Sequence, residues 1–379
     1  MANVMKIGIV GLGQIAENAY LPDLHNPSEG FEVTWLCDSA DHRLKWGQSV
    51  VPTARTTTRY ADMLRDRDLN WVFVLTPLMA HASMVRQALM AGKNVYTEKP
   101  LSVDFDEARE IVDLARKKRL LVASAPVMLL YPVYEHVRSL VLGGAIGTVT
   151  SARVLMANPG PNTWQFKSDP GWFFREKTAS KIPPIPDLAV YGISFLTRVF
   201  GPAKRVSAMA SLVQRERRID KVSAPGFKPY TIRPRIDDSV VVSIEYANGV
   251  LATIASNYTT GGRRPDEYEF YGTEGTLTMP LAADRFSIQS TLPPYDKPAE
   301  LHDVSMAGRR GGVFYEEWQW GPILVRHIRD CLARGVKPLV GASFTLHVVE
   351  VIAAAMRSAR TGSAEKITTS FQHDRKLEM

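Results

Sequence analysis

The chain of 379 residues is 45% hydrophobic and 22% charged, which fits a globular protein of two or three domains and excludes disordered, collagen-like and coiled-coil proteins. Lys and Arg number 46 against 39 Asp and Glu, but the positive residues stand in short, scattered clusters, so we expect solvated surface and no nucleic-acid partner. Cys37 and Cys331 cannot build a disulfide framework, no apolar stretch reaches the about 18–20 residues of a membrane span, and the N-terminus shows no signal-peptide pattern. We therefore expect a cytoplasmic protein without a membrane partner.

Short apolar runs alternate with segments of helical length over the first third of the chain. The runs lie at 5–11, 33–37, 71–76, 94–97 and 120–123, and the helical segments lie at 14–20, 39–47, 60–65, 78–90 and 104–118. This rhythm predicts parallel strands joined by right-handed helical crossovers. Residues 1–127 are therefore expected to form a doubly wound α/β domain.

The rhythm changes beyond about residue 130. Helices are predicted at 133–142, 187–200, 318–333 and 345–360, and strands at 239–246, 250–257, 267–271 and 276–279. The first two strands are joined by Asn248-Gly249, the strongest short hairpin signal. We predict that residues 128–379 form an α+β domain, in which helices cover one face of a large, open, mainly antiparallel sheet.

The sequence GLGQIA at 11–16 has the pattern G-x-G-x-x-A, directly after the first predicted strand and at the start of a helix. Gly11 permits a tight turn, Gly13 lets the backbone approach a pyrophosphate, and Ala16 allows close packing of helix against strand. Amides at the helix start, at Gln14 and Ile15, then hold the phosphates. The first domain is therefore predicted to be a Rossmann domain that binds a dinucleotide.

Asp38 ends the second predicted strand. An acid at this point accepts hydrogen bonds from the adenosine ribose hydroxyls and repels a 2′-phosphate, which favours NAD over NADP. Two alternatives stay open: Arg43 could turn toward a 2′-phosphate, and Asp38 could serve only as a helix N-cap. NADP therefore remains a second choice of cofactor.

Three segments resemble the Gfo/Idh/MocA oxidoreductases: GIVGLGQIA near the start, TPLMAH at 76–81, and Glu98-Lys99-Pro100 after a predicted strand. The resemblance runs nearly end to end and implies a Rossmann domain followed by a substrate-binding and oligomerisation domain with a large open sheet. It also implies a cis peptide before Pro100 and places Lys99 beside the nicotinamide and the reacting carbon. Further cofactor neighbours implied by the resemblance are Thr76, Pro77, His81 and Glu98, with His81 acting as a structural hydrogen-bond partner more than as a catalyst.

A lysine suits the chemistry that the resemblance implies. Oxidising an alcohol by hydride transfer requires removal of the hydroxyl proton, which a base of near-neutral pKa does best. Burial beside a positively charged nicotinamide lowers the proton affinity of an ammonium group. We therefore predict that Lys99 binds the substrate and acts as acid and base; the alternative is that Lys99 only donates a hydrogen bond to substrate or loop.

The second signature of the family, Asp-x-Gly-x-His, aligns with residues 187–191, where Asp187 matches while Ala189 and Tyr191 depart. Residues four apart share one helix face, so Asp187 and Tyr191 can point at one substrate. A phenol with a pKa of about 10 donates a hydrogen bond well but is a poor base at pH 7. Asp187 and Tyr191 are therefore predicted to orient the substrate; the alternatives are an N-cap for Asp187 and a packed ring for Tyr191.

A long irregular segment, 158–186, is rich in proline and aromatic residues, and loops of this length are commonly functional. Trp164 and Trp172 offer flat faces to a sugar ring, or only anchor the loop. We predict an NAD(P)-dependent enzyme that moves hydride between nicotinamide C4 and a secondary alcohol or ketone of a sugar, cyclitol or glycoside. The alternatives are a dehydrogenase of aromatic, non-sugar diols and a non-catalytic regulator that senses a sugar or a dinucleotide.

No pair of histidines has metal spacing with a third ligand nearby, so no metal site is predicted. Strands 239–246 and 250–257 show no wholly charged outer face, and such a face tolerates contact with a second copy. Open sheets in the family commonly pack face to face. We therefore expect a homodimer or homotetramer, with a monomer whose sheet face is solvated as the alternative.

Overall fold

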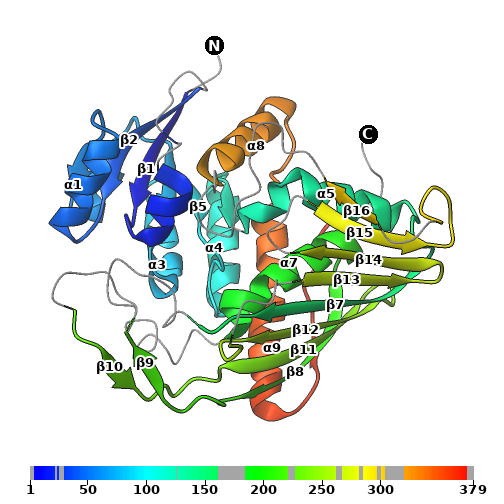
Figure 1. Ribbon diagram of the computed structural model, residues 1–379. Coiled ribbons are helices and arrows are strands. Elements are labelled where there is room, and N and C mark those ends of the chain that lie inside the picture. The colour runs from blue at the N-terminus through cyan, green and yellow to red at the C-terminus, as the bar shows by residue number, and fades with distance from the viewer. Residues whose placement is uncertain are drawn as a thin grey trace. The chain divides into compact units, whose positions relative to one another are not determined.

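The computed structural model describes residues 4–21, 24, 30–124, 126–160, 184–220, 227–261, 267–280, 285–296, 300–303 and 320–373 (Figure 1). The chain divides into two compact units, Met1–Tyr131 with Arg310–Val349, and Pro132–Arg309 with Glu350–Met379. The sequence interpretation placed one boundary between residues 127 and 128. The two divisions differ because the segment 310–349 belongs to the first unit, where Ser124 N donates a hydrogen bond to Val340 O (3.0 Å). Local sequence patterns do not indicate a contact between such distant segments.

The first unit contains a six-stranded sheet in the order β3-β2-β1-β4-β5-β6, and its paired strands are parallel. The strands are β1 (Met5–Val10), β2 (Phe31–Cys37), β3 (Arg55–Thr57), β4 (Trp71–Val74), β5 (Asn94–Thr97) and β6 (Val122–Ser124). The strand order reverses between β1 and β4, so the carboxyl ends of these strands form the switch point at which open α/β sheets bind ligands. The doubly wound sheet is confirmed, but the sequence analysis missed β3, because its residues Arg-Thr-Thr form no apolar run.

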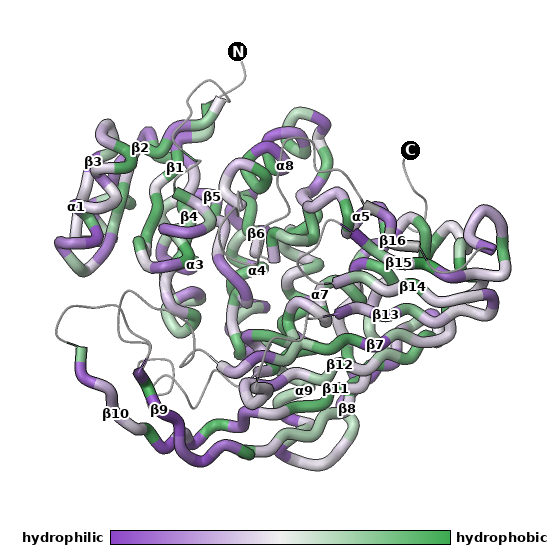
Figure 2. The backbone as a smooth tube through the Cα atoms, in the orientation of Figure 1, coloured by the Kyte–Doolittle hydropathy of each residue, from purple (hydrophilic) through white to green (hydrophobic). Residues whose placement is uncertain are grey.

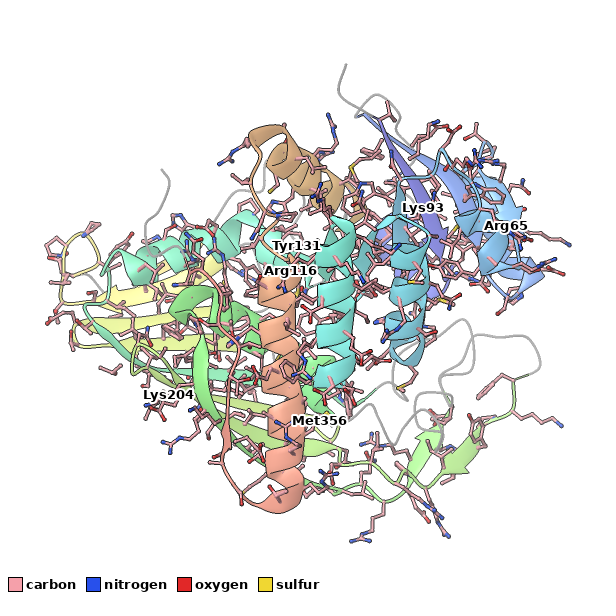
Figure 3. All side chains as sticks on the ribbon, turned by 180° about the vertical axis from the view of Figure 1, so that it is seen from behind. Arg65, Lys93, Arg116, Tyr131, Lys204 and Met356 are labelled. Carbon is pink, nitrogen blue, oxygen red and sulfur yellow. The ribbon has the colours of Figure 1, made fainter. Side chains whose placement is uncertain are left out.

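The crossover segments of the first unit are helical, as expected. They are η1 (Ala16–Tyr20, a π-helix), α1 (Asp41–Val50), α2 (Tyr60–Leu64), α3 (Leu78–Met90) and α4 (Phe105–Lys118). The 3₁₀ turn η4 (Val127–Leu130) follows the last strand, and α8 (Trp320–Arg334), which the sequence analysis assigned to the second domain, belongs to this first unit. Helix α4 begins where Asp104 accepts a hydrogen bond from Glu107 N (3.0 Å), and it ends at Arg119, whose φ is 56°. Its apolar stripe is buried beside α3 (Figures 1 and 3).

Lys93, labelled in Figure 3, is buried immediately before β5. Its ammonium group donates to Asp66 O (2.6 Å) and Leu69 O (2.8 Å) and so closes the loop that leads into β4. Burial lowers the pKa of Lys93, while the charges of Asp66 and Asp68 act in the opposite direction. The residue is a structural support of the sheet that carries the turns described below.

The second unit is built on a nine-stranded sheet in the order β16-β15-β14-β13-β7-β12-β11-β8-β17. Its strands are β7 (Val149–Ala157), β8 (Ala203–Ser211), β11 (Ser239–Tyr246), β12 (Leu251–Asn257), β13 (Glu267–Gly272), β14 (Gly275–Pro280), β15 (Arg285–Ser290), β16 (Glu300–Asp303) and β17 (Glu365–Lys366). Only β7 and β12 among these neighbours pair in parallel, so the predicted mainly antiparallel sheet and its Asn-Gly hairpin are confirmed.

Helices cover one face of this sheet (Figure 1). They are α5 (Pro132–Leu142), the π-helix η7 (Ile185–Ala189) and α7 (Val190–Phe200), and α9 (Ala342–Thr361) contributes its residues from Glu350 onward to this unit. Helix α7 lies very close to the sheet at Gly192, where an added Cβ would come within 3.2 Å of Ile254 Cδ1 and Val154 Cγ1. The lack of a side chain at Gly192 therefore allows α7, which follows Asp187 in the chain, to pack closely against the sheet.

A two-stranded hairpin, β9 (Arg217–Ile219) with β10 (Tyr230–Ile232), is inserted between β8 and β11. Figure 2 shows that β9 is largely hydrophilic. Two-stranded hairpins are marginally stable alone, so this one depends on contacts with the rest of the unit. Its buried residue Arg217 provides such contacts, as described below.

None of the helices within the described ranges combines the length and the apolar character that crossing a bilayer requires. Cys37 and Cys331 are both buried free thiols.

Candidate cofactor and substrate sites

The turn after β1 requires glycine. Gly11 has φ +89°, and an added Cβ would lie 2.7 Å from the main-chain atoms Leu75 C and Thr76 N. Gly11 N donates to Cys37 O (2.9 Å), and Leu75 N donates to Val10 O (2.8 Å), so the ends of β1, β2 and β4 are tied together. No residue larger than glycine fits between these strand ends.

Gly13 lies on the open side of the same turn. A Cβ built at this position meets nothing within 4 Å, and both Gly13 and Gln14 are exposed. Ile15 is half-buried, and Ala16 is completely buried against the sheet. This exposed, side-chain-poor turn at the switch point is a cradle of the kind that accepts a pyrophosphate.

Asp38 connects the end of β2 to this cradle. Its Oδ2 accepts a hydrogen bond from Leu12 N (2.7 Å) and its Oδ1 from Ala40 N (2.9 Å). Each carboxylate oxygen has a second lone pair with which to accept a ribose hydroxyl. The carboxylate is thus fixed beside the turn, and its capping of Ala40 does not prevent it from binding a ribose.

Arg43 is engaged within the protein. Its guanidinium donates to Leu12 O (2.5 Å), pairs with Glu17 Oε2 (3.1 Å) and stacks over the ring of Trp46 at 4.7 Å. The carboxylate of Glu17 offsets the positive charge that a 2′-phosphate would require. Since Glu17 lies 26 residues away, sequence reasoning about Arg43 did not anticipate this pair.

His81 connects the turn after β4 to the loop after β5. Its Nε2 lies 2.7 Å from Thr76 O and its Nδ1 lies 2.9 Å from Pro100 O, and the ring is buried. Burial lowers the pKa of His81, an effect to which the charge of Lys99 adds and which the two carbonyl contacts oppose. A neutral imidazole carries one N–H, so one of the two carbonyls accepts its hydrogen bond, and the ring lies between the loops that carry Thr76, Pro77 and Lys99.

Glu98 is a buried carboxylate, 6% exposed, next to Lys99 in the chain. Its Oε2 accepts a hydrogen bond from Lys99 N (3.0 Å), and its Oε1 accepts one from the phenol of Tyr20. The Tyr20 hydroxyl also lies 2.5 Å from that of Tyr96. Burial first, and then the negative charge of Glu98, raises the pKa of Tyr20 well above its usual value, so Tyr20 stays a neutral donor.

This network gives Lys99 a fixed main chain while its side chain is only half-buried. The Lys99–Pro100 peptide is cis, as the resemblance implied. Sequence reasoning missed Tyr20 and Tyr96, although a tyrosine in a buried strand, as Tyr96 is in β5, is the type of signal that marks a buried polar contact.

In the second unit, Asp187 and Tyr191 share one helix face. Every other residue from 184 to 197 is buried, whereas these two are half-buried. The predicted spacing of four residues therefore does present both side chains on the one accessible strip of η7 and α7. Both remain candidates for substrate contact.

Tyr258, which follows β12 directly, joins this pair. Its phenol donates to Asp187 Oδ2 (2.5 Å). Burial, then the charge of Asp187, raises the pKa of Tyr258 well above its usual value, and Tyr191 is among the groups that act on it. Sequence reasoning missed Tyr258, because no local pattern connects residues 71 positions apart.

The predicted site residues Trp164 and Trp172 lie outside the described residues. Lys99 belongs to the first unit, whereas Asp187 and Tyr191 belong to the second. In the part of the chain that the structure describes, no cluster of three or more His, Cys, Asp or Glu is arranged to hold a metal ion.

Two family models match the chain. Residues 5–125 match an oxidoreductase family with an NAD-binding Rossmann fold, and residues 134–278 match the GFO/IDH/MocA C-terminal domain.

Relatives named as dehydrogenases are about 25% identical to this chain over most of its length. Trans-1,2-dihydrobenzene-1,2-diol dehydrogenase of Oryctolagus cuniculus is 26% identical over 305 residues, which is 77% of this chain and 80% of that enzyme. The Xenopus laevis enzyme of the same name is 25% identical over 335 residues, which is 88% of this chain and 90% of that enzyme.

Solved structures share the fold over nearly the whole chain. Levoglucosan dehydrogenase in complex with NADH and levoglucosan has a TM-score of 0.80 at 19% identity, covering 96% of this chain and 99% of that one. An oxidoreductase from Agrobacterium radiobacter in complex with NAD+, L-tartaric acid and magnesium has a TM-score of 0.76 at 17% identity, covering 96% and 98%. At these identities the likeness establishes the fold alone.

Proposed function

Because this chain belongs to the GFO/IDH/MocA family of NAD-binding oxidoreductases, as its motifs predicted, we propose that it is a dehydrogenase or reductase with Lys99 as acid and base. The observation that carries this proposal is the way in which the main chain at Lys99 is held. The buried carboxylate of Glu98 accepts a hydrogen bond from the amide of Lys99, and the buried ring of His81 contacts the carbonyl of Pro100. A half-buried amine on such a fixed main chain suits proton transfer, which depends on position as much as on pKa.

The residues of the first unit fit NAD. The Gly11–Gly13 turn and Asp38 would hold the pyrophosphate and the adenosine ribose, and the bound cofactor supplies the hydride acceptor or donor. Lys99 takes the hydroxyl proton in oxidation and returns it in reduction. Asp187 and Tyr191 bind and orient the substrate oxygen.

NAD is proposed over NADP. Asp38 presents a negative charge at the end of β2, and Arg43, the alternative phosphate ligand, is paired with Glu17. A 2′-phosphate would therefore meet the carboxylate of Asp38, while the charge of Arg43 is already offset by Glu17.

The substrate is proposed to be a secondary alcohol or ketone of a sugar, cyclitol or glycoside. A second candidate, an aromatic or alicyclic trans-diol, is supported by the dihydrodiol dehydrogenases among the relatives and by Tyr191 on the accessible helix strip. NADH formation with parallel panels of sugars, glycosides and trans-dihydrodiols, with Lys99→Ala as the control, decides between them. NAD binding without turnover on either panel would favour the non-catalytic regulator.

A homodimer or homotetramer is proposed from the face of the sheet opposite the helices. Met209, Val241 and Leu251 point outward there with 73%, 40% and 58% of their surface exposed, and Val241 pairs directly with Met209. A sheet face that mixes such exposed apolar side chains with polar ones suits an isologous contact with a second copy. A cytoplasmic location is proposed in keeping with two buried free thiols.

A further inference from the structure

We propose that Tyr258 is a positioning residue for Asp187, and that the buried pair Arg217–Asp238 fixes Tyr258 in turn. The inference rests on the proposed function, in which Asp187 binds the substrate oxygen. It assigns a role in this activity to three residues that carry no motif and to the inserted hairpin that begins with β9.

The first step concerns the Asp187 carboxylate. It is half-buried on the accessible strip of η7, and its Oδ2 accepts the short, charge-assisted hydrogen bond from Tyr258 (2.5 Å). A donor of this kind restricts the rotation of a carboxylate about its Cβ–Cγ bond. The phenol therefore favours one orientation of the Asp187 carboxylate and contributes to the way its other oxygen meets a substrate hydroxyl.

The second step concerns Tyr258 itself. Its side chain is completely buried, and burial together with the charge of Asp187 raises the pKa of the phenol well above its usual value. At neutral pH Tyr258 is therefore the donor and Asp187 the acceptor. A buried, protonated tyrosine suits the positioning of a carboxylate, because its hydroxyl is shielded from solvent.

The third step concerns the main chain of Tyr258, which is held at both polar groups. Tyr258 N donates to Asp238 O (2.8 Å), and Tyr258 O accepts from Arg217 Nη1 (2.9 Å). Arg217 Nη2 lies 2.9 Å from Asp238 Oδ2, so the two residues that hold Tyr258 are also paired with each other. Tyr258, Arg217 and Asp238 thus form one hydrogen-bonded network, and the phenol of Tyr258 connects it to Asp187.

This ion pair is fully desolvated, since Arg217 and Asp238 are both about 1–2% exposed. Asp238 also accepts hydrogen bonds from Val213 N (2.8 Å) and Gln214 N (2.9 Å). Buried ion pairs seldom stabilise a fold more than apolar residues of the same size would, so we assign this pair the role of holding one geometry around Tyr258. Arg217 stands on β9, and the inserted hairpin therefore brings the cation to Tyr258.

The test compares Tyr258→Phe with Tyr246→Phe, a matched loss of a completely buried tyrosine hydroxyl on β11. For each variant, and for Asp187→Asn and the double variant Tyr258→Phe/Asp187→Asn, we would measure kcat and KM on the substrate identified by the panels, together with the Kd of NAD. We expect Tyr258→Phe to lower kcat/KM about tenfold or more with unchanged NAD affinity, and Tyr246→Phe to lower it less than twofold. The double variant should be no worse than Asp187→Asn alone, since both changes disable one unit.

The outcomes separate the inference from the proposed function. Impaired Asp187→Asn with fully active Tyr258→Phe, or effects that multiply in the double variant, would overturn the positioning role and leave the function standing. Fully active Asp187→Asn would instead remove Asp187 from the substrate site, and the inference with it. A crystal structure of Tyr258→Phe gives a reading without turnover: we expect the Asp187 carboxylate to have rotated, and an unmoved carboxylate would contradict the proposal.

Discussion

Replacing Tyr20 by Phe tests whether the buried network around Glu98 supports Lys99. The change removes one oxygen, which donates to the Glu98 carboxylate and contacts the Tyr96 hydroxyl, and leaves the ring packed edge-on against Trp320 at 5.9 Å. Because the ring stays in place, no large cavity forms. The loss is therefore that of the polar contact alone.

The magnitude follows from the charge of the acceptor. A buried hydrogen bond to a charged group contributes about 1.5–3 kcal/mol, against about 0.5–1.5 kcal/mol for a neutral acceptor. Glu98 is a carboxylate, so Tyr20→Phe should destabilise the protein by about 2 kcal/mol. Tyr60 is the matched control in the same unit, since its phenol donates to the neutral carbonyl of Met84 (3.0 Å), and Tyr60→Phe should cost about 1 kcal/mol.

Scanning calorimetry of the three proteins measures this difference. For a unit of about 150–250 residues, each kcal/mol lowers Tm by about 2–4 °C, so Tyr20→Phe should lower it by about 4–8 °C and Tyr60→Phe by about 2–4 °C. Equal losses in the two variants would refute the argument that Tyr20 serves a buried carboxylate. Turnover should also fall in Tyr20→Phe but not in Tyr60→Phe, because Glu98 accepts a hydrogen bond from the amide of Lys99.

Three further changes test other parts of the molecule. Glu350 accepts four hydrogen bonds from Thr368 and Thr369; burial alone would raise its pKa, but these bonds lower it below 4.5, so its stabilisation is present above that pH and lost as the pH falls further. Below pH 4.5, the free energy of unfolding measured with urea should therefore fall more steeply with decreasing pH for the wild type than for Glu350→Gln. The same pH dependence in both proteins would contradict this. Asp38→Ala should narrow the preference for NAD over NADP in titrations by about tenfold, the scale of one charged hydrogen bond, and an unchanged ratio would remove Asp38 from cofactor selection. Leu251→Glu should shift the mass measured by light scattering toward the 42.1 kDa of a single chain, whereas an undisturbed oligomer would exclude this sheet face as the interface.

Local patterns predicted the parts of the molecule that local chemistry determines. The turn after β1 requires glycine at position 11, and the helix over residues 78–90 has the bounds that its sequence indicated. The Asn-Gly hairpin joins β11 and β12 as expected. The short strand β3 was missed because its partly exposed Thr and Arg residues resemble a loop.

The supports of the candidate site were beyond sequence reasoning for a different reason. Tyr258 meets Asp187 across 71 positions, and Arg217 meets Tyr258 across 41. Such pairs exist only once the sheet of the second unit has formed, and neither residue belongs to a motif. A charge cluster on an inserted hairpin was interpreted as solvated surface, whereas Arg217 within it is buried.

The central claim, that Lys99 transfers the proton, is tested most directly by the turnover of Lys99→Met, with Lys118→Met as a control that removes an exposed lysine from α4 of the same unit. Loss of an acid or base of this kind lowers kcat by about 10²–10⁴-fold, and NAD affinity should be nearly unchanged, because the Gly11 turn and Asp38 are intact. Lys118→Met should behave as the wild type. Wild-type turnover in Lys99→Met would contradict the account.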